Sequence, residues 1–142
     1  MIIPDVNVLV YAHNAGIPEH EAARRWWESV VNGAEPVGLA WVAVLGFVRL
    51  MSNPTVVARP QPPAALLARV EAMLAAPVIR LVAPGPRHAT LMREAFENSG
   101  AGPRLVTDVH LATLAIELDA ILATNDADFT RFPGLRTVNP LH

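Results

Sequence analysis

Short apolar runs alternate with longer segments of helical periodicity along this chain, and prolines separate many of them. The short runs predict strands over residues 2–4, 37–39, 78–82, 120–124 and 136–138. The periodic segments predict helices over residues 6–13, 19–31, 41–51, 64–75, 86–97 and 106–118. Residues 53–63 are rich in proline and are expected to form an extended loop.

This alternation of strands and helices predicts the α/β fold class, with a mostly parallel sheet and helices on both faces. A chain of 142 residues suits one domain with a sizeable core, so residues 1–142 are expected to form a single unit. In open α/β sheets, ligands bind at the edge where the strands reach their carboxyl ends. Polar residues at that edge are therefore the first candidates for function.

Composition and charge narrow the possible functions. Hydrophobic residues make up 52% of the chain, which excludes a disordered or fibrous protein. All 11 basic residues are arginine and the net charge is −2, so any nucleic-acid binding must use a local arginine patch. The absence of cysteine excludes disulfides and thiolate metal sites. Without a signal-peptide pattern or a sufficiently long apolar run, a soluble cytoplasmic protein with no membrane contact is expected.

Three of the five aspartates are predicted to meet at the carboxyl edge of the sheet. Asp5 directly follows the first strand, and Asp126 follows the strand predicted over residues 120–124. Asp108 opens the helix that leads into that strand, and such a helix begins at the same edge. Local explanations stay open for Asp108 as a charge in a first helical turn and for Asp126 as a turn former. Asp128 is expected to cap the turn that follows.

Carboxylates brought so close together need a neutralising partner. At an effective dielectric constant near 20, two carboxylates about 4 Å apart repel by roughly 4 kcal/mol, so three such pairs approach the whole stability of a small domain. Either bound protons or a cation must offset this repulsion. Oxygen ligands without cysteine favour a hard divalent ion such as Mg²⁺ or Mn²⁺, which points to metal-assisted attack of water on a phosphodiester.

Three segments resemble the motifs of the PIN-domain family, and more narrowly those of the VapC-type ribonuclease toxins of bacterial toxin–antitoxin pairs. The segments are Pro4-Asp5-Val6-Asn7-Val8-Leu9, Thr107-Asp108-Val109-His110-Leu111-Ala112, and Thr124-Asn125-Asp126-Ala127-Asp128-Phe129 followed by Phe132-Pro133-Gly134-Leu135. Their order and spacing match over nearly the whole chain. The resemblance implies a three-layer α/β/α fold and a Mg²⁺- or Mn²⁺-dependent endoribonuclease that cleaves cellular RNA such as tRNA or ribosomal RNA. It also implies a cognate VapB-like antitoxin and a homodimer.

The same resemblance assigns roles to individual residues. The family's catalytic and metal-binding carboxylates correspond to Asp5, Asp108 and Asp126. The candidate supporting residues are Asn7, Thr124 and Asp128. Arg49 and Arg104 are candidate contacts to RNA phosphates, with a salt bridge or a solvated position as the alternative for each.

One position departs from the family pattern. PIN domains usually carry an acidic residue, commonly glutamate, in the helix that corresponds to residues 41–51, and the register places Gly46 there. No acidic residue lies between Glu35 and Glu71. The site is therefore expected to bind one ion with water in place of the missing carboxylate, or to need substrate phosphate to complete the ligand shell. Close helix packing is the structural alternative for Gly46.

Two other functions stay open. A catalytically weak or inactive PIN domain that acts only as an antitoxin- or RNA-binding partner would fit the glycine at position 46 and an apolar groove. The aromatic residues available for such a groove are Trp26, Trp27, Trp41 and Phe47. A phosphatase similar to the haloacid dehalogenases also places an aspartate after its first strand. The second acidic residue of that motif is replaced by Asn7 here, and the chain has none of the lysine that such enzymes use. The histidines show no zinc-like spacing, so a structural or supporting role is expected for His110.

Overall fold

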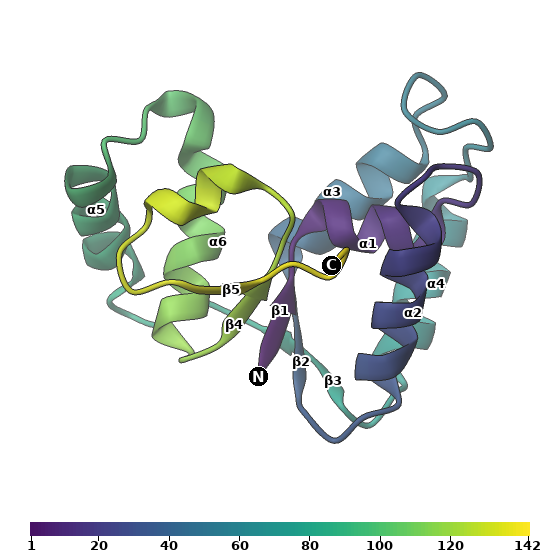
Figure 1. Ribbon diagram of the computed structural model, residues 1–142, viewed down its shortest axis with the longest axis horizontal. Helices are drawn as coiled ribbons and strands as arrows, with labels where there is room; N and C mark the ends of the chain where they lie inside the picture. The colour runs from purple at the N-terminus through teal and green to yellow at the C-terminus, as the bar shows by residue number, and fades with distance from the viewer.

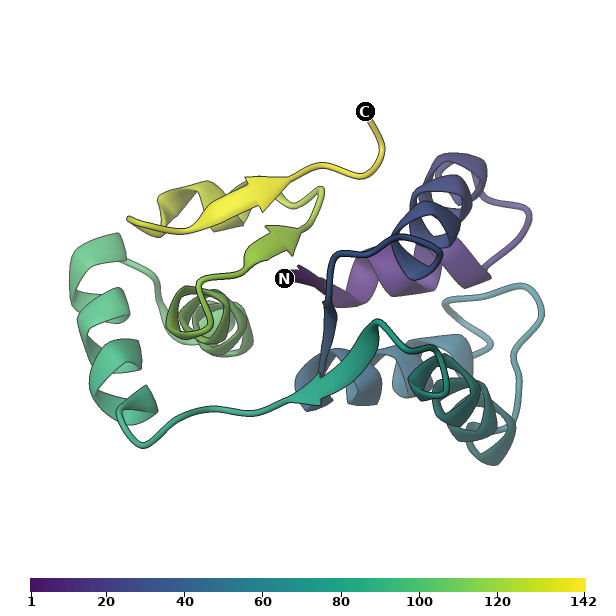
Figure 2. The same cartoon turned by 90° about the horizontal axis from the view of Figure 1, so that it is seen from below.

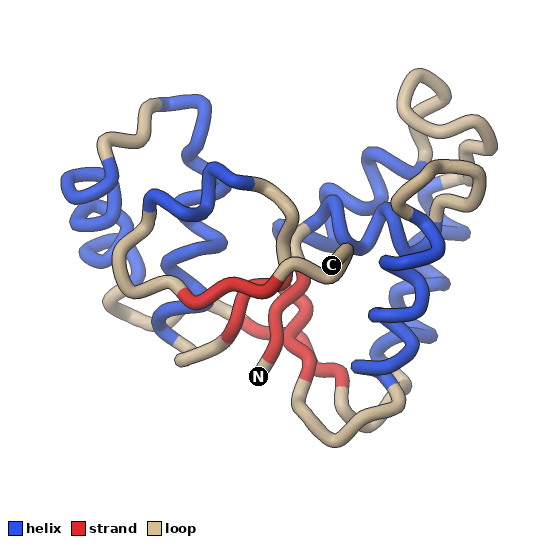
Figure 3. The backbone as a smooth tube through the Cα atoms, viewed as in Figure 1, coloured by secondary structure: helices blue, strands red, loops and turns tan.

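Five parallel strands form the centre of the molecule, and the structure, a computed structural model, describes all residues from 1 to 142. The strands follow the order β3-β2-β1-β4-β5 across one sheet, and each neighbouring pair is parallel. They are β1 (Ile2–Pro4), β2 (Val37–Ala40), β3 (Ile79–Val82), β4 (Ile121–Ala123) and β5 (Arg136–Val138). Figure 3 shows the strands in red between two groups of helices. The predicted α/β fold with a parallel sheet is confirmed.

Six α-helices cover the two faces of this sheet. They are α1 (Val6–His13), α2 (His20–Val31), α3 (Trp41–Met51), α4 (Pro63–Leu74), α5 (His88–Ser99) and α6 (Val106–Glu117). Two short 3₁₀ helices, η1 (Pro103–Leu105) and η2 (Ala127–Arg131), come before α6 and after β4. Figures 1 and 2 show α1 to α4 on one face and α5 with α6 on the other, which is the predicted three-layer arrangement. None of these helices is both long and apolar enough to cross a membrane.

Most helix and strand boundaries lie where the sequence predicts them. α4 begins at Pro63, because proline lacks the N–H that the first helical turn leaves unbonded in any case. The helix predicted over residues 86–97 is displaced by two residues at each end. This helix, α5, begins at His88 and continues to Ser99, where Gly100 adopts a left-handed conformation (φ 69°) and ends it.

One contiguous cluster of 27 buried residues forms the hydrophobic core. The sequence of α6 is apolar on most sides, and this helix buries Val109, Leu111, Ala112, Thr113, Leu114 and Ala115. α5 has no buried residue and covers α6 from outside. Of the aromatic residues considered for a surface groove, Phe47 and Trp27 are buried, so they belong to the core. Trp26 is half-buried and Trp41 is exposed.

The order in which strands are added to the sheet reverses at β1, which pairs with β2 on one side and with β4 on the other. The chain passes outward from β1 to β2 and β3 and then returns through α5 and α6 to β4. The register pairs Pro4 with Ala123, so the residues that follow β1 and β4 lie side by side. The Asp5 N–H donates to the Ala123 carbonyl oxygen (2.9 Å) and extends this pairing. Open α/β sheets bind their ligands at such a topological switch point, where the strand order reverses.

Gly46 lies in the middle of α3, where this helix contacts the first residue of α1. A Cβ atom at position 46 would lie 2.5 Å from Val6 Cγ2, which is closer than real Cβ atoms come to other atoms. The close approach of α3 to α1 therefore explains the glycine, although its helix propensity is about 1 kcal/mol poorer than that of alanine. The packing explanation offered for Gly46 agrees with this contact.

We expect Gly46→Ala to destabilise the protein by about 1–3 kcal/mol, because the added methyl group must displace Val6 or separate α3 from α1. Val6→Ala should offset most of that loss when the two substitutions are combined, since it removes the colliding methyl groups. The measurement is a double-mutant cycle of unfolding free energies from urea titrations. Additive effects of the two substitutions would contradict this explanation.

Candidate active site

Asp5 occupies the turn between β1 and α1 and is almost completely buried. Its Oδ1 accepts a hydrogen bond from the Val6 N–H (2.6 Å), and its Oδ2 accepts one from Thr124 Oγ1 (3.0 Å). The carboxylate thus caps the N-terminus of α1 and is tied to the end of β4. Burial raises the pKa of Asp5 from 3.8 to about 6, and the two hydrogen bonds oppose this rise. The charges of Asp108 and Asp126 raise it further.

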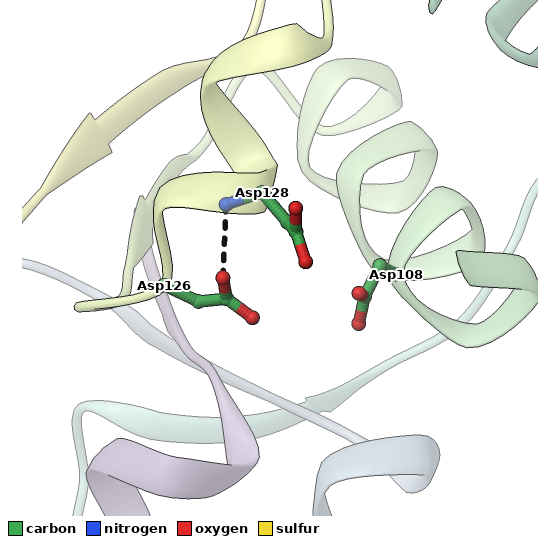
Figure 4. A group of neighbouring side chains, drawn as sticks. All are labelled: Asp108, Asp126 and Asp128. Atoms are coloured by element: carbon green, nitrogen blue, oxygen red, sulfur yellow. Dashed lines mark hydrogen bonds between the residues drawn. The ribbon is translucent and has the colours of Figure 1, made fainter. Parts of the chain in front are cut away.

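A group of three more carboxylates lies where η2 faces the first turn of α6 (Figure 4). Carboxylate oxygens of Asp108, Asp126 and Asp128 all lie within 4.8 Å of one another. Asp108 belongs to α6, and the other two belong to the segment that follows β4. All three side chains are partly exposed, so the group is open to solvent. Asp108 and Asp126 therefore meet at the predicted edge of the sheet, and Asp128 joins them.

The short helix η2 is capped by Asp126 and not by Asp128. Because η2 begins at Ala127, the cap position falls on Asp126, whose Oδ1 accepts a hydrogen bond from the Asp128 N–H (2.9 Å; Figure 4). The prediction that Asp128 caps this turn is wrong. The Asp126 N–H donates to Thr124 Oγ1 (3.0 Å), so the Thr124 hydroxyl connects Asp126 to the carboxylate at position 5.

Repulsion within the three-carboxylate group is only partly offset by the protein. Two carboxylates 4.8 Å apart repel by roughly 3 kcal/mol at an effective dielectric constant near 20. Burial raises the pKa of Asp108, and the charges of Asp126 and Asp128 raise it further. Arg104 and Arg131 act in the opposite direction. Both arginines form ion pairs with Asp128, whereas Asp108 and Asp126 have none.

A pocket of about 190 Å³ lies between the N-terminal ends of α1 and α6 and one side of α3. Its lining includes the carboxylates of Asp5 and Asp108 together with Gly46 and Arg49. The Arg49 side chain is exposed and takes part in none of the ion pairs of the protein. The salt-bridge alternative for Arg49 is therefore not observed, and its guanidinium group remains available to a ligand of this pocket.

The other candidate residues differ in their surroundings. Arg104 Nη1 lies 3.6 Å from Asp128 Oδ2, so the salt-bridge alternative for Arg104 is observed, although this side chain is 76% exposed. Asn7 lies in the first turn of α1, is half-buried, and does not line the pocket beside Asp5.

The ion pair between Arg131 and Asp128, whose Nη2 and Oδ1 atoms are 3.1 Å apart, is not among the contacts predicted from the sequence. The available signal was their spacing of three residues, which places side chains on one face of a helical turn. The contact between His88 and His110, whose Nε2 and Nδ1 atoms are 2.8 Å apart, is not among them either. His88 Nδ1 bonds to Glu117 Oε1 as well. These side chains meet only because α5 packs on α6, and sequence spacing does not reveal that packing.

The donor atoms at this edge suit a hard divalent cation. Asp5, Asp108 and Asp126 offer carboxylate oxygens, which Mg²⁺ and Mn²⁺ prefer over nitrogen or sulfur ligands. Asp108 and Asp126, which are partly exposed, form no ion pair within the protein, so a bound metal ion would relieve their repulsion. Gly46 offers no side-chain ligand on the α3 side of the pocket, so the other ligands of an ion bound there would be water or phosphate oxygens.

Comparison with known proteins identifies the family of this chain. Residues 2–135 match the PIN domain. Ribonuclease VapC33 of Mycobacterium tuberculosis is 40% identical over 141 residues, which cover 99% of each chain. Ribonuclease VapC37 of the same species is 42% identical over 140 residues, which cover 99% of this chain and 97% of that protein. VapBC2 of Rickettsia felis, solved with a DNA fragment from its promoter, has a TM-score of 0.69 at 18% identity and covers 98% of each chain.

The chain therefore belongs to the PIN-domain family. Within that family, its full-length similarity is to the VapC proteins. The resemblance of the sequence motifs to this family is confirmed, and a phosphatase of the haloacid dehalogenase type is not supported.

The raised pKa of Asp5 makes stability depend on pH. A folded-state pKa of about 6 against 3.8 means that the folded protein keeps this proton longer than the unfolded chain does, so stability falls as the pH rises from about 4 to 6. Without divalent cations, we expect Asp5→Asn to gain up to about 3 kcal/mol relative to the original protein between pH 4 and pH 7. Urea unfolding across this range measures the difference.

Asp119→Asn is the matched control, because Asp119 is exposed and lies away from the three-carboxylate group. Its stability difference from the original protein should stay nearly constant over the same range. A flat difference for Asp5→Asn would show that burial does not raise the pKa of this carboxyl.

Proposed function

We propose that this protein is a divalent-cation-dependent endoribonuclease of the VapC toxin type. The observation that carries the proposal is the placement of three aspartates at the edge where the strand order of the sheet reverses: carboxylate oxygens of Asp108 and Asp126 lie within 4.8 Å of each other, and Asp5 lines one pocket with Asp108. Carboxylates without protein counterions favour a hard cation, and such cations serve phosphodiester hydrolysis. Full-length relatives at 40% and 42% identity carry the name ribonuclease, which supports the same reaction.

In this proposal, Asp5, Asp108 and Asp126 are both the cation ligands and the catalytic carboxylates. Mg²⁺ or Mn²⁺, when bound there, supplies an activated water and stabilises the negative charge that develops on the phosphate. The Val6 N–H and the Thr124 hydroxyl keep the Asp5 carboxylate in one orientation. The cap of η2 does the same for Asp126. The ligands are therefore oriented before substrate arrives, which lowers the entropic cost of reaching the reactive geometry.

RNA is the proposed substrate, and tRNA or ribosomal RNA is the target class expected from the family. Arg49, at the mouth of the pocket, and Arg104, beside Asp128, are the proposed contacts to RNA phosphates. A VapB-like antitoxin is the proposed protein partner, because the fold matches a chain of the VapBC2 structure. A homodimer and a single domain over residues 1–142 remain predictions.

A PIN domain of weak or no activity that works only by binding is the second candidate. The glycine at position 46 favours it, because no carboxylate lies on the α3 side of the pocket. Under the first proposal, water or a substrate phosphate oxygen fills that position. Activity toward RNA separates the two candidates directly.

We expect the purified protein to cleave total cellular RNA with Mg²⁺ or Mn²⁺ and to stop when EDTA is added. Asp108→Asn and Asp126→Asn should each lower the rate at least about 100-fold, since metal assistance contributes several kcal/mol to such a step. Asparagine also caps helices well, so Asp126→Asn should keep η2 in place. Gel analysis of end-labelled RNA measures the rates.

Asp119→Asn serves as the control and should cleave like the original protein. Cleavage that persists in EDTA or in both asparagine variants would contradict the role of the cation. A folded protein that cleaves no cellular RNA would favour the binding-only candidate.

A further inference from the structure

Two arginines from separate parts of the chain share one carboxylate at the rim of the proposed active site. Arg131 ends η2, and its Nη2 lies 3.1 Å from Asp128 Oδ1, while its Nε donates to the Asp128 carbonyl oxygen (3.3 Å). Arg104 lies in η1, just before α6, and its Nη1 lies 3.6 Å from Asp128 Oδ2. Asp128 thus holds one guanidinium on each of its two oxygens.

The position of these cations relates them to the proposed reaction centre. Asp128 lies within 4.8 Å of the carboxylate oxygens of Asp108 and Asp126. Both guanidiniums contact Asp128, so they lie near the carboxylates proposed to bind the cation. An RNA strand that approaches this edge meets negative charge first, and nearby cations are needed to make that approach favourable.

Both arginines also keep hydrogen-bond donors for a ligand. A guanidinium has five N–H donors in a planar fork. Arg131 uses its Nε and Nη2 atoms within the protein, and its Nη1 atom makes no hydrogen bond. The contact of Arg104 is too long for a hydrogen bond, so all its donors are free. The free N–H donors of each guanidinium match the paired oxygens of a phosphate.

We propose that Arg104 and Arg131 form a phosphate-binding pair for the RNA backbone, and that Asp128 is a positioning residue for both rather than a cation ligand. The inference rests on the proposed ribonuclease function and adds Arg131 and Asp128 to its machinery. The phosphate bound there would be a neighbour of the scissile one, because Asp128, which contacts both arginines, lies within 4.8 Å of carboxylate oxygens of Asp108 and Asp126. Because Asp128 contacts both guanidinium groups, it would fix the distance between the phosphate that they bind and the scissile phosphate.

The test is equilibrium binding of a fluorescent single-stranded RNA in Mg²⁺, in the Asp5→Asn background to suppress cleavage, over a series of salt concentrations. Arg131→Gln and Arg104→Gln should each weaken binding about tenfold and lower the slope of log K against log salt by about 0.7, the loss of one phosphate contact. Arg131→Lys should restore the slope but only part of the affinity.

Arg93→Gln is the matched control, because Arg93 pairs with Glu97 on α5 and lies outside the group of carboxylates. It should leave both the affinity and the slope unchanged. Calorimetric titration with Mn²⁺ should show that Arg131→Gln binds the ion at least as tightly as the original protein, since a nearby positive charge has been removed.

The positioning role of Asp128 is tested by a double-mutant cycle. If Asp128 orients Arg131, the loss of RNA affinity on Arg131→Gln should shrink to about twofold or less in the Asp128→Asn background. An undiminished loss in that background would overturn the positioning role.

Arginine variants that bind RNA like Arg93→Gln, while the original protein cleaves RNA, would overturn this inference and leave the proposed function intact. A folded original protein that neither binds nor cleaves RNA would overturn both.

Discussion

The pairing of β1 with β4 is the constraint on which the proposed site depends. Its register places Pro4 opposite Ala123, so Asp5 and Thr124 follow side by side and are joined by a hydrogen bond. Asp5 and Thr124 are 119 positions apart in the sequence, and only the return of the chain through α5 and α6 brings them together. The same return delivers the first turn of α6, with Asp108, to this edge.

Burial and mutual repulsion determine the protonation of the carboxyl groups at this edge of the sheet. Burial raises the pKa of Asp5 to about 6, and burial together with the neighbouring carboxylates raises the pKa of Asp108 as well. Carboxyl groups with raised pKa values lower the stability of the folded protein near neutral pH. The proposed metal ion would offset this loss, because it would relieve the repulsion between them. Arg104 and Arg131 form ion pairs with Asp128, whereas Asp108 and Asp126 form none and are the carboxylates proposed to bind a cation.

The sequence predicts the fold class and most element boundaries because the apolar periodicity and the prolines act locally. It also predicts that Asp5, Asp108 and Asp126 lie at one edge of the sheet, since the strand and helix ends of an α/β sheet determine that edge; the structure brings Asp108 and Asp126 together and places Asp5 on one pocket with Asp108. It could not predict that Arg104 and Arg131 share Asp128, because that contact depends on how η1 packs beside η2. The contact of Gly46 with Val6 likewise depends on the distance between α1 and α3.

The most direct test of the account is a crystal structure of the protein soaked in Mn²⁺, with anomalous scattering used to locate the ion. We expect one Mn²⁺ coordinated by oxygens of Asp5, Asp108 and Asp126, with Asp128 still bound to its arginines. An ion bound elsewhere, or none at a Mn²⁺ concentration that supports RNA cleavage, would contradict it.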